Sequence, residues 1–354
     1  MSNSIVPAAN TSADRAPLQF PTMGCGTWAW GNRLLWNYDP AMDAELQRVF
    51  DRCLDAGVTL FDTGDSYGTG KLSGRSEMLL GQFSRAYFAP RSTPADSETP
   101  NSTPLRSTID RSRLCLATKL APFPWRLTRR SMVAAGEAST QRLGAIDLVQ
   151  LHWSTANYFP WQEGALLDGL MDLVATGQAR GVGLSNFGAK RLRQVHRRFA
   201  DRGIPIASLQ VQYSLLSTYP VTELGVKDLC DELGIKLIAY SPLALGLLTG
   251  KYPEGDYPGG LRGLLCRQIL PGAKPLLACL AAIARSRQKT MAQVALNWCI
   301  TKGAIPIPGA KTVAQAEQNI GALGWQLDAG EVAELDREAA RVPKTMVQNN
   351  FQTR

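Results

Sequence analysis

The sequence has few histidines and no clustered cysteines. It contains only two histidines, His152 and His196, and its seven cysteines include no Cys-x-x-Cys pair. Structural zinc sites need clustered Cys and His ligands. Scattered cysteines in an odd number are typical of small core residues in a reducing compartment. We therefore predict no metal site and no disulfide framework.

Long apolar runs and a complete dinucleotide fingerprint are also missing. No run approaches the roughly 20 apolar residues that span a bilayer, so we predict no membrane span. Gly24-Cys25-Gly26 lacks the third glycine of the Gly-x-Gly-x-x-Gly pattern, which makes a Rossmann fold a weak alternative. The formal charge of +8 favours anionic ligands. The basic run 190–202 falls on a predicted helix without a nucleic-acid-binding motif, so we predict no nucleic-acid partner.

Short apolar runs alternate with helical periodicity from Met23 onward. In the segment 163–176 the leucines fall on one face, and Gly177 stands where a helix C-cap glycine belongs. Other helical segments are 43–56, 130–143, 188–200 and 222–233. The pattern predicts an α/β protein, one closed (β/α)8 TIM barrel with its active site at the C-terminal mouth. The eight predicted strands are 23–27, 58–62, 114–119, 146–152, 179–185, 208–211, 236–240 and 304–307.

Three segments depart from this repetition. Residues 1–18 are small, polar and without pattern, and we expect them to be disordered before a barrel domain over 19–354. The Pro-, Ser- and Thr-rich stretch at about 90–110 is predicted to be a disordered insertion. Residues 241–289 form a long excursion after the seventh strand, which we predict to be a loop over the barrel mouth.

Polar side chains stand at or just beyond three successive predicted strand ends: Asp62 and Tyr67, Lys119, and His152. A phenol with a pKa near ~10 is a reluctant acid, and a neighbouring ammonium lowers that pKa. The carboxylate would keep Lys119 charged, and the imidazole can orient a carbonyl substrate. Taken singly, each residue would be solvated or structural. Together they predict a proton-donating site.

In order and context, these four residues resemble the catalytic tetrad of the aldo-keto reductases. The resemblance covers nearly the whole chain, from Gly24-Cys25-Gly26-Thr27-Trp28 to the C-terminal region. It implies that Tyr67 gives a proton to a carbonyl oxygen, that Lys119 assists it, that Asp62 holds Lys119, and that His152 orients the substrate.

The same resemblance implies a nicotinamide cofactor. Gly309 lies in a turn that leads into a helix N-terminus, a common anion site, and Lys311 can meet a phosphate. Gln315 and Gln318 stand where the family often has Arg and Glu. Lys311 is the cation that compensates for the missing positive charge, so we expect NADPH rather than NADH as the cofactor. The residues assigned to the cofactor are Gly26, Thr27, Trp28, Asp62, Ser185, Asn186, Gln210, Tyr240, Ser241, Pro242, Leu243, Gly246, Leu248, Lys251, Gly309, Lys311, Gln315, Gln318 and Asn319.

Aromatic side chains are predicted to wall the substrate side, because aromatic walls suit a flat ring. The candidates are Trp28, Trp30, Trp36, Trp125 and Trp153, beside Tyr67 and His152. Four longer stretches, at 26–36, 151–156, 267–272 and 348–354, are similar to the plant-type pyridoxal reductases, which are chloroplast members of the family. This similarity implies NADPH-dependent reduction of pyridoxal to pyridoxine and a chloroplast location, with the cytoplasm as the alternative.

Two other functions stay open at this point. One is a reductase of the same fold with broad specificity for aldehydes and ketones. The other is a cofactor-bound regulatory subunit, which the complete tetrad disfavours. Whether the protein is a pyridoxal reductase or a broader reductase, its expected partner is a small-molecule aldehyde or ketone.

Overall fold

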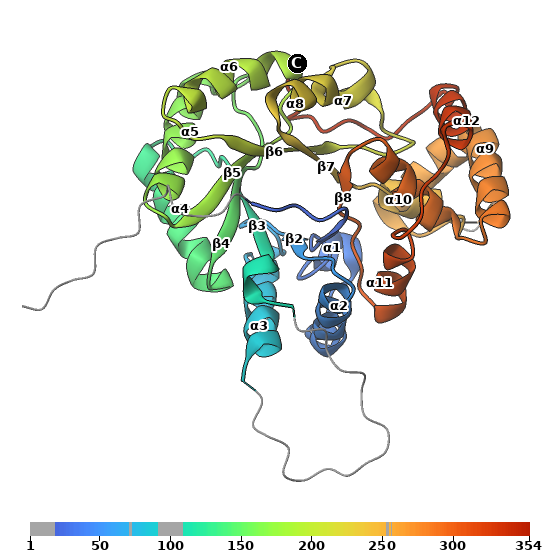
Figure 1. Ribbon diagram of the computed structural model, residues 1–354, viewed down its shortest axis with the longest axis horizontal. Helices are drawn as coiled ribbons and strands as arrows, with labels where there is room; N and C mark the ends of the chain where they lie inside the picture. The colour runs from blue at the N-terminus through green and yellow to red at the C-terminus, as the bar shows by residue number, and fades with distance from the viewer. Residues whose placement is uncertain (1–17, 71–72, 91–108, 253–254, 256) are drawn as a thin grey trace, which may run out of the picture.

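Eight parallel strands stand in the order of the chain and form the centre of the molecule (Figure 1). The computed structural model describes residues 18–354 except 71–72, 91–108, 253–254 and 256. The disorder predicted for 1–18 and 90–110 therefore falls almost entirely outside the described residues. The strands are β1 (Gly24–Gly26), β2 (Leu60–Asp62), β3 (Cys115–Leu120), β4 (Ile146–Leu151), β5 (Ala179–Ser185), β6 (Ile206–Gln212), β7 (Lys236–Tyr240) and β8 (Ile305–Pro306).

The barrel closes where β1 meets the end of β8. The Gly26 N–H donates to the carbonyl of Pro308 at 3.2 Å, and Gly26 forms a parallel bridge with Gly309. A Cβ atom on residue 26 would lie 2.8 Å from the carbonyl oxygen of Ile307, so only glycine allows this approach. The predicted single barrel is confirmed.

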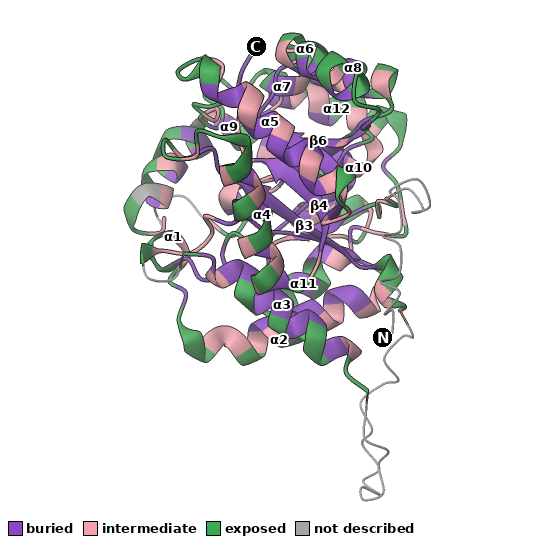
Figure 2. Cartoon of the chain, turned by 90° about the vertical axis from the view of Figure 1, so that its left-hand side faces the viewer, coloured by how far each residue is buried: buried purple, intermediate pink, exposed green. Residues whose placement is uncertain are grey.

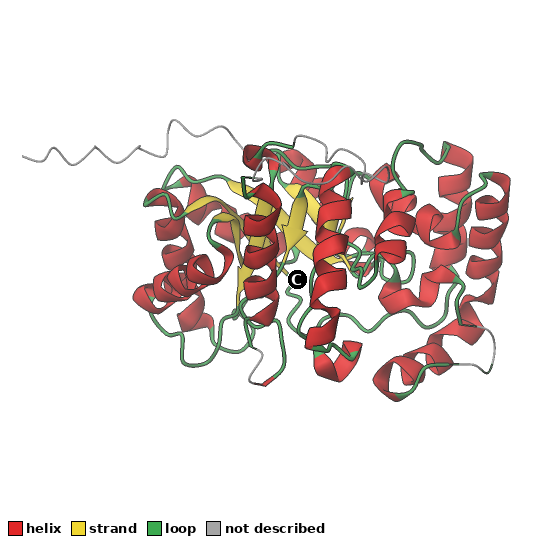
Figure 3. Cartoon of the chain, turned by 90° about the horizontal axis from the view of Figure 1, so that it is seen from below, coloured by secondary structure: helices red, strands yellow, loops and turns green. Residues whose placement is uncertain are grey.

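Helices flank the strands and lie in front of them in the view of Figure 3. Several start at side-chain caps that the sequence supplies, such as the capping box of Thr128 and Ser131 before α4. Gly177 follows α5 with a φ of 75°, as a residue beyond a helix C-cap should. The helices are α1 (Arg33–Trp36), α2 (Asp43–Asp55), α3 (Arg75–Phe88), α4 (Arg129–Leu143), α5 (Pro160–Ala175), α6 (Ala189–Ala200), α7 (Tyr219–Thr222), α8 (Val226–Leu233), α9 (Gly260–Ser286), α10 (Met291–Thr301), α11 (Val313–Ile320) and α12 (Ala329–Ala340).

The excursion after β7 corrects one expectation. Most of 241–289 is not a loop, because α9 alone spans 27 residues and contains Pro271 and Pro275. Both prolines are exposed, whereas Ala273, Leu276 and Leu280 between and after them are buried. Proline has no backbone N–H, so each of them removes one hydrogen bond of the helix, and both gaps lie on the solvent side. Packing of the apolar face stabilises the helix in spite of them.

Helix α9 also qualifies the expectation that no segment could span a bilayer. Its residues Arg262–Ser286 are long and apolar enough by length and composition, and it is the one described helix of that kind. In Figure 1 it lies beside α12 at the outer edge of the molecule, and its buried face is part of the main apolar core.

The core has two parts. The larger lies between the strands and the surrounding helices, and Figure 2 shows the strands buried beneath partly exposed helices. The smaller fills the barrel with strand residues such as Leu60, Leu148 and Ile238, and Leu18 and Phe20 pack against it. All seven cysteines are buried and free, as expected for small core residues.

Candidate active site

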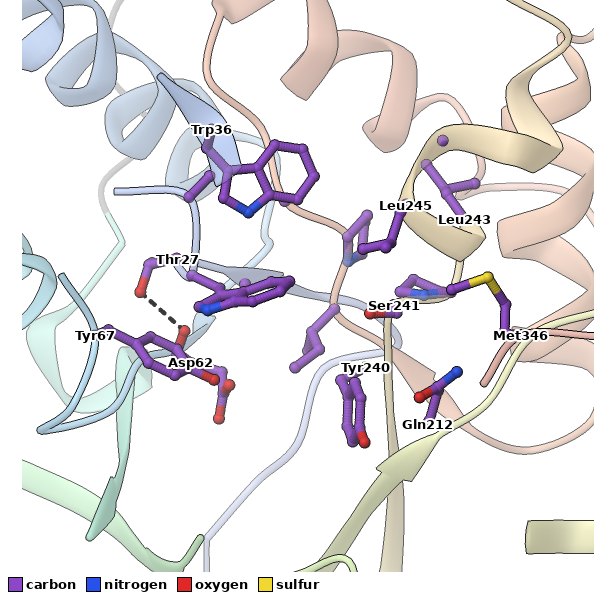
Figure 4. Close-up of a pocket in the computed structure, with 18 of the residues that line it drawn as sticks. Thr27, Trp36, Asp62, Tyr67, Gln212, Tyr240, Ser241, Leu243, Leu245 and Met346 are labelled. Atoms are coloured by element: carbon purple, nitrogen blue, oxygen red, sulfur yellow. Dashed lines mark hydrogen bonds between the residues drawn. The ribbon is translucent and has the colours of Figure 1, made fainter. Parts of the chain in front are cut away.

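A cavity of about 740 Å³ opens at the carboxyl ends of the strands. In Figure 4, Tyr67 and Asp62 lie on one side of it and Ser241 and Tyr240 on the other, with Trp36 at its upper edge. Parallel barrel strands direct their carboxyl ends to one face, and their following loops build the site there. The four residues predicted from the strand ends all line this cavity.

Lys119 joins the acid and the phenol. Its Nζ donates to Asp62 Oδ1 in a buried ion pair, to the carbonyl of Thr63 at 3.0 Å and to the hydroxyl of Tyr67 at 3.1 Å. Burial lowers the pKa of Lys119, but the attraction of Asp62 and Tyr67 outweighs it, and the pKa lies above its ordinary value. Lys119 is therefore a fixed cation beside the phenol.

Two amides complete the surroundings of Asp62. Gln150 and Gln210 each donate through Nε2 to Asp62 Oδ2, at 3.0 and 2.9 Å. All of these side chains are buried. A buried carboxylate needs such donors to offset its lost hydration. The amides leave Oδ1 for Lys119 and so fix the direction of the ion pair.

The phenol of Tyr67 differs from expectation in one respect. Burial raises its pKa, Lys119 lowers it and Asp62 raises it again, and the result lies above the ordinary value for tyrosine. The sequence predicted a lowered pKa from the lysine alone, because burial could not be read from it. At neutral pH the phenol keeps its proton, which is the form that can donate.

His152 lies next to this phenol. The centroids of the two rings are 5.7 Å apart, and His152 Nδ1 lies 3.4 Å from Ser66 Oγ. Burial and then the charge of Lys119 lower the pKa of His152 well below its ordinary value. The imidazole is therefore neutral at pH 7. A neutral imidazole carries one N–H, so Tyr67 and His152 can both direct a donor toward one carbonyl oxygen.

The ends of β5 and β7 present amide and phenol groups to the same cavity. Asn186 Nδ2 donates to the carbonyl of His152 and to Ser185 Oγ, both at 3.1 Å. The Tyr240 hydroxyl donates to Asn186 Oδ1 at 2.9 Å. These groups form a polar wall opposite the acid and the phenol, suited to a flat ligand with an amide.

Three cations gather at another end of the cavity: Lys251, Arg262 and Lys311. Burial lowers the pKa of Lys311, and repulsion by Arg262 and Lys251 lowers it further. The Arg262 guanidinium lies 4.8 Å from the ring centroid of Trp36, and Lys311 Nζ donates to the Trp36 carbonyl at 3.0 Å. Such a concentration of positive charge favours a polyanion.

The helix N-terminus near Gly309 is already occupied by the protein's own groups. The Val313 N–H donates to Glu45 Oε1 at 2.8 Å, and the Gln315 N–H donates to Thr312 Oγ1 at 3.2 Å. The Lys311 N–H donates to Gln315 Oε1 at 2.8 Å. The expected backbone anion site is therefore less open than the sequence implied, and the cationic side chains provide the anion-binding groups.

Comparison with known proteins agrees with this geometry. A family model described as the aldo/keto reductase family matches residues 22–339. The chain belongs to the aldo/keto reductase family. A curated relative, the chloroplastic pyridoxal reductase of Arabidopsis thaliana, is 50% identical over 340 residues, which are 96% of this chain and 88% of that protein.

Other aldo-keto reductases match more distantly. The L-glyceraldehyde 3-phosphate reductase of Escherichia coli K12 is 27% identical, covering 92% of this chain and 91% of its own length. A structure of an aldo/keto reductase from Klebsiella pneumoniae in complex with NADP and acetate has a TM-score of 0.65 at 26% identity, covering 94% of this chain and 95% of that chain. The glycerol dehydrogenase of Gluconobacter oxydans, with a TM-score of 0.72, 23% identity and coverage of 94% and 96%, shares the fold.

Most residues assigned to the cofactor from the sequence line the cavity of this aldo-keto reductase. Leu248 is the exception, because it is fully buried in the apolar core beside the cavity. The lining set is Gly26, Thr27, Trp28, Asp62, Ser185, Asn186, Gln210, Tyr240, Ser241, Pro242, Leu243, Gly246, Lys251, Gly309, Lys311, Gln315, Gln318 and Asn319.

The tryptophans divide between cavity and core. Trp28 and Trp36 line the cavity, with ring centroids 5.9 Å apart. Trp30 is fully buried instead, where its Nε1 donates to the carbonyl of Ala310 at 3.0 Å and helps close the barrel. Trp153 contacts the His152 ring, with centroids 4.8 Å apart, but does not line the cavity. Trp125 is 72% exposed and stacked on Phe123. The sequence does not show which tryptophans of a short loop face the cavity and which face the core.

Among the lining residues that the sequence does not predict, Arg262 and a C-terminal group bring polar chemistry to the cavity. Arg262 belongs to the excursion after β7, for which the sequence predicts cofactor contacts only between Ser241 and Lys251. Met346, Val347 and Asn349 come from the C-terminal segment, which was noticed only for its resemblance to relatives. The one available signal for Arg262 was a basic residue in a long insertion over the barrel mouth.

Proposed function

We propose that this aldo-keto reductase catalyses the NADPH-dependent reduction of pyridoxal to pyridoxine. The observation that carries the proposal is the 50% identity, over 96% of this chain, to a chloroplastic pyridoxal reductase. The geometry supports it independently of that relative, because the proton donor, the neutral histidine and a cation-lined cleft share one cavity.

The residues present fit a phosphate-bearing dinucleotide. Lys251, Arg262 and Lys311 would hold its phosphates, and Asn186, Gln210 and Tyr240 would hold the nicotinamide end. Two buried groups on this cavity, Arg262 Nε and Trp36 Nε1, have no hydrogen-bond partner among the described residues. Buried polar groups normally have partners, so both suit a site completed by a polar ligand.

The protein's own part in the reduction follows from the tetrad. When bound, NADPH supplies the hydride that reduces the aldehyde carbon. The Tyr67 hydroxyl gives its proton to the carbonyl oxygen, so that one hydride and one proton together convert the aldehyde to an alcohol. Lys119, 3.1 Å from that hydroxyl, stabilises the phenolate left behind. His152, neutral and beside Tyr67, orients the same oxygen through its N–H.

An aromatic aldehyde suits the substrate side of the cavity. Trp28 presents a ring surface there, and Ser66 brings a hydroxyl beside His152. The Trp36 ring instead faces the cations Arg262 and Lys311. Rings stack on or meet the edges of other rings favourably. A pyridine ring that carries hydroxyl groups uses both kinds of contact.

The direct test is product formation by the purified full-length chain. NADPH consumption and pyridoxine production from pyridoxal should proceed one to one, and both should be lost in Tyr67→Phe. NADPH consumption with simple aldehydes but no pyridoxine from pyridoxal would contradict the proposal and favour the broad carbonyl reductase. NADPH binding without turnover of any aldehyde would favour the regulatory subunit.

We also infer a chloroplast location from the named compartment of the Arabidopsis thaliana relative. A fluorescent protein fused to the C-terminus of the full chain in leaf cells should accumulate in chloroplasts. Uniform cytoplasmic fluorescence would contradict this inference and leave the enzymatic proposal intact.

A further inference from the structure

The C-terminal segment, residues 346–354, lies across the carboxyl ends of β5, β6 and β7. The Met346 N–H donates to the carbonyl of Leu216 at 2.8 Å. Gln212 Nε2 donates to the carbonyl of Val347 at 3.3 Å, and Gln348 Nε2 donates to Ser217 Oγ at 3.1 Å. These bonds fix the segment to loops beyond β6, and so place it on the same face as the cavity.

The end of the segment is anchored at the start of α6. The Gly188 N–H donates to Thr353 Oγ1 at 3.0 Å, and the Arg191 N–H donates to the carbonyl of Arg354 at 3.2 Å. A Cβ atom on residue 188 would lie 2.3 Å from the Thr353 carbonyl oxygen, which shows how closely the two backbones pack. The Thr353 N–H also donates to the carbonyl of Asn186 at 3.2 Å.

Between these anchors, Asn349 reaches into the cavity. Its Nδ2 donates to the hydroxyl of Tyr240 at 3.1 Å, and its Oδ1 accepts from the Phe351 N–H at 2.9 Å. The second bond fixes which end of the amide is the donor. Because the Tyr240 hydroxyl accepts from Asn349, its own proton is directed to Asn186 Oδ1, 2.9 Å away.

The chain of bonds then continues to the catalytic face. Asn186 Nδ2 donates to the carbonyl of His152 at 3.1 Å. Asn186 has a φ of 62°, in the left-handed region, where a residue other than glycine depends on its surroundings. Its backbone N–H donates to the carbonyl of Gln210 at 2.9 Å. The support for Asn186 therefore comes both from the barrel and from the C-terminal segment.

We propose that Asn349 is a positioning residue: through the Tyr240 hydroxyl it holds the Tyr240 ring and the Asn186 amide in the arrangement that receives the nicotinamide end of the cofactor. This inference rests on the proposed use of the cavity for NADPH. It makes the C-terminal segment a working part of the active site rather than a covering of the barrel.

The test compares four single variants and one double variant in the full-length protein. Asn349→Leu removes the donor. Asn349→Asp keeps the size and the acceptor for Phe351 but takes the Tyr240 proton away from Asn186. Tyr240→Phe removes the hydroxyl through which Asn349 acts. Asn350→Ala, at an exposed neighbouring position, is the matched control. Each is measured for NADPH affinity by fluorescence titration, for kcat and KM, and for the thermal midpoint.

Loss of a hydrogen bond of this type should weaken NADPH binding about two- to tenfold. We expect this effect in Asn349→Leu and Asn349→Asp, with a fall in kcat, and no effect in Asn350→Ala. In the double variant with Tyr240→Phe, Asn349→Leu should add nothing, because both act through one hydroxyl. A merely structural role would instead lower the thermal midpoint and leave NADPH affinity unchanged in the folded protein.

The proposal would be overturned if the losses of NADPH affinity caused by Asn349→Leu and Tyr240→Phe multiplied in the double variant. Unchanged NADPH affinity in both Asn349 variants would also overturn it. If Asn349→Leu fails to fold, Asn349→Asp decides. Failure of the proposed substrate is distinguishable, since NADPH titration needs no aldehyde and kcat can be measured with any aldehyde that the wild-type protein reduces. A wild-type protein that does not bind NADPH would overturn both proposals.

Discussion

At the scale of single residues, burial decides the protonation of the site. It raises the pKa of Tyr67 and lowers that of His152, and in both cases the neutral form is favoured. The buried pair of Lys119 and Asp62 supplies fixed charges beside them. Two neutral donors next to a fixed cation are what a carbonyl oxygen needs when it takes up a proton.

Tyr67→Phe tests the assignment of the proton donor. The ring and its packing remain, so NADPH affinity should hardly change, while kcat should fall about 10²–10⁴-fold, the usual contribution of an acid–base group. Steady-state kinetics and a fluorescence titration of NADPH measure the two effects. Near wild-type turnover would show that another group donates the proton.

The cation cluster makes a separate prediction about cofactor choice. Lys311→Ala should weaken NADPH more than NADH, since only NADPH carries the 2′-phosphate, by roughly 1.5–3 kcal/mol. The exposed Lys236 lies at the amino end of β7, away from the cavity, and Lys236→Ala is the matched control. Equal losses for the two cofactors would show that Lys311 does not contact that phosphate.

At the scale of elements, the site depends on how neighbouring strands and loops are joined. Closure of β1 onto β8 brings Gly26 and Gly309 together and so places Trp28 and Lys311 on one cavity. The loops after β2 and β3 are joined by the ion pair of the buried Asp65 with the partly buried Arg126, close to Tyr67.

Gly26→Ala should open the barrel seam. The added methyl would lie 2.8 Å from the Ile307 carbonyl oxygen, so the backbone must shift, and such overpacking costs about 1–3 kcal/mol. Gly164→Ala in α5, where the nearest atom would be 3.6 Å away on the Arg198 side chain, is the control and should be neutral or stabilising. Equal unfolding free energies for Gly26→Ala and the wild-type protein in urea would contradict this view of the closure.

Asp65 should make stability depend on pH. Burial raises its pKa from 3.8 to about 6, and the pairing with Arg126 offsets this only in part. Between these pH values the folded state binds more protons than the unfolded state, so stability is lost as pH rises. Asp65→Asn does not titrate, and its unfolding free energy relative to wild type should therefore increase from about pH 4 to 6. Parallel profiles for the two proteins would exclude the raised pKa.

At the scale of the whole molecule, periodicity predicted the architecture. The strands from β2 to β8 and helices such as α2, α4 and α6 lie within a few residues of their predicted bounds, because buried strands and amphipathic helices have different apolar periods. The helix α9 was missed because Pro271 and Pro275 normally interrupt helices, and its stability comes from packing that sequence does not show.

The site was predictable where it depended on strand ends and not where it depended on distant segments. Asp62, Lys119 and His152 converge because a barrel brings strand ends together. Trp30 was placed on the wrong side of its loop, since its partner Ala310 is 280 residues away. Asn349 was missed for the same reason, because its contact with Tyr240 spans 109 residues.

A cavity built for pyridoxal should discriminate it from a simpler aromatic aldehyde. The kcat/KM for pyridoxal is measured with NADPH beside that for benzaldehyde, which keeps the flat ring and the aldehyde but lacks the hydroxyl groups and ring nitrogen. A site with polar partners for those groups rejects an analogue that lacks them, by up to about 10⁴-fold. We expect a much higher kcat/KM for pyridoxal than for benzaldehyde. Comparable values for the two aldehydes would contradict this expectation and identify a general carbonyl reductase.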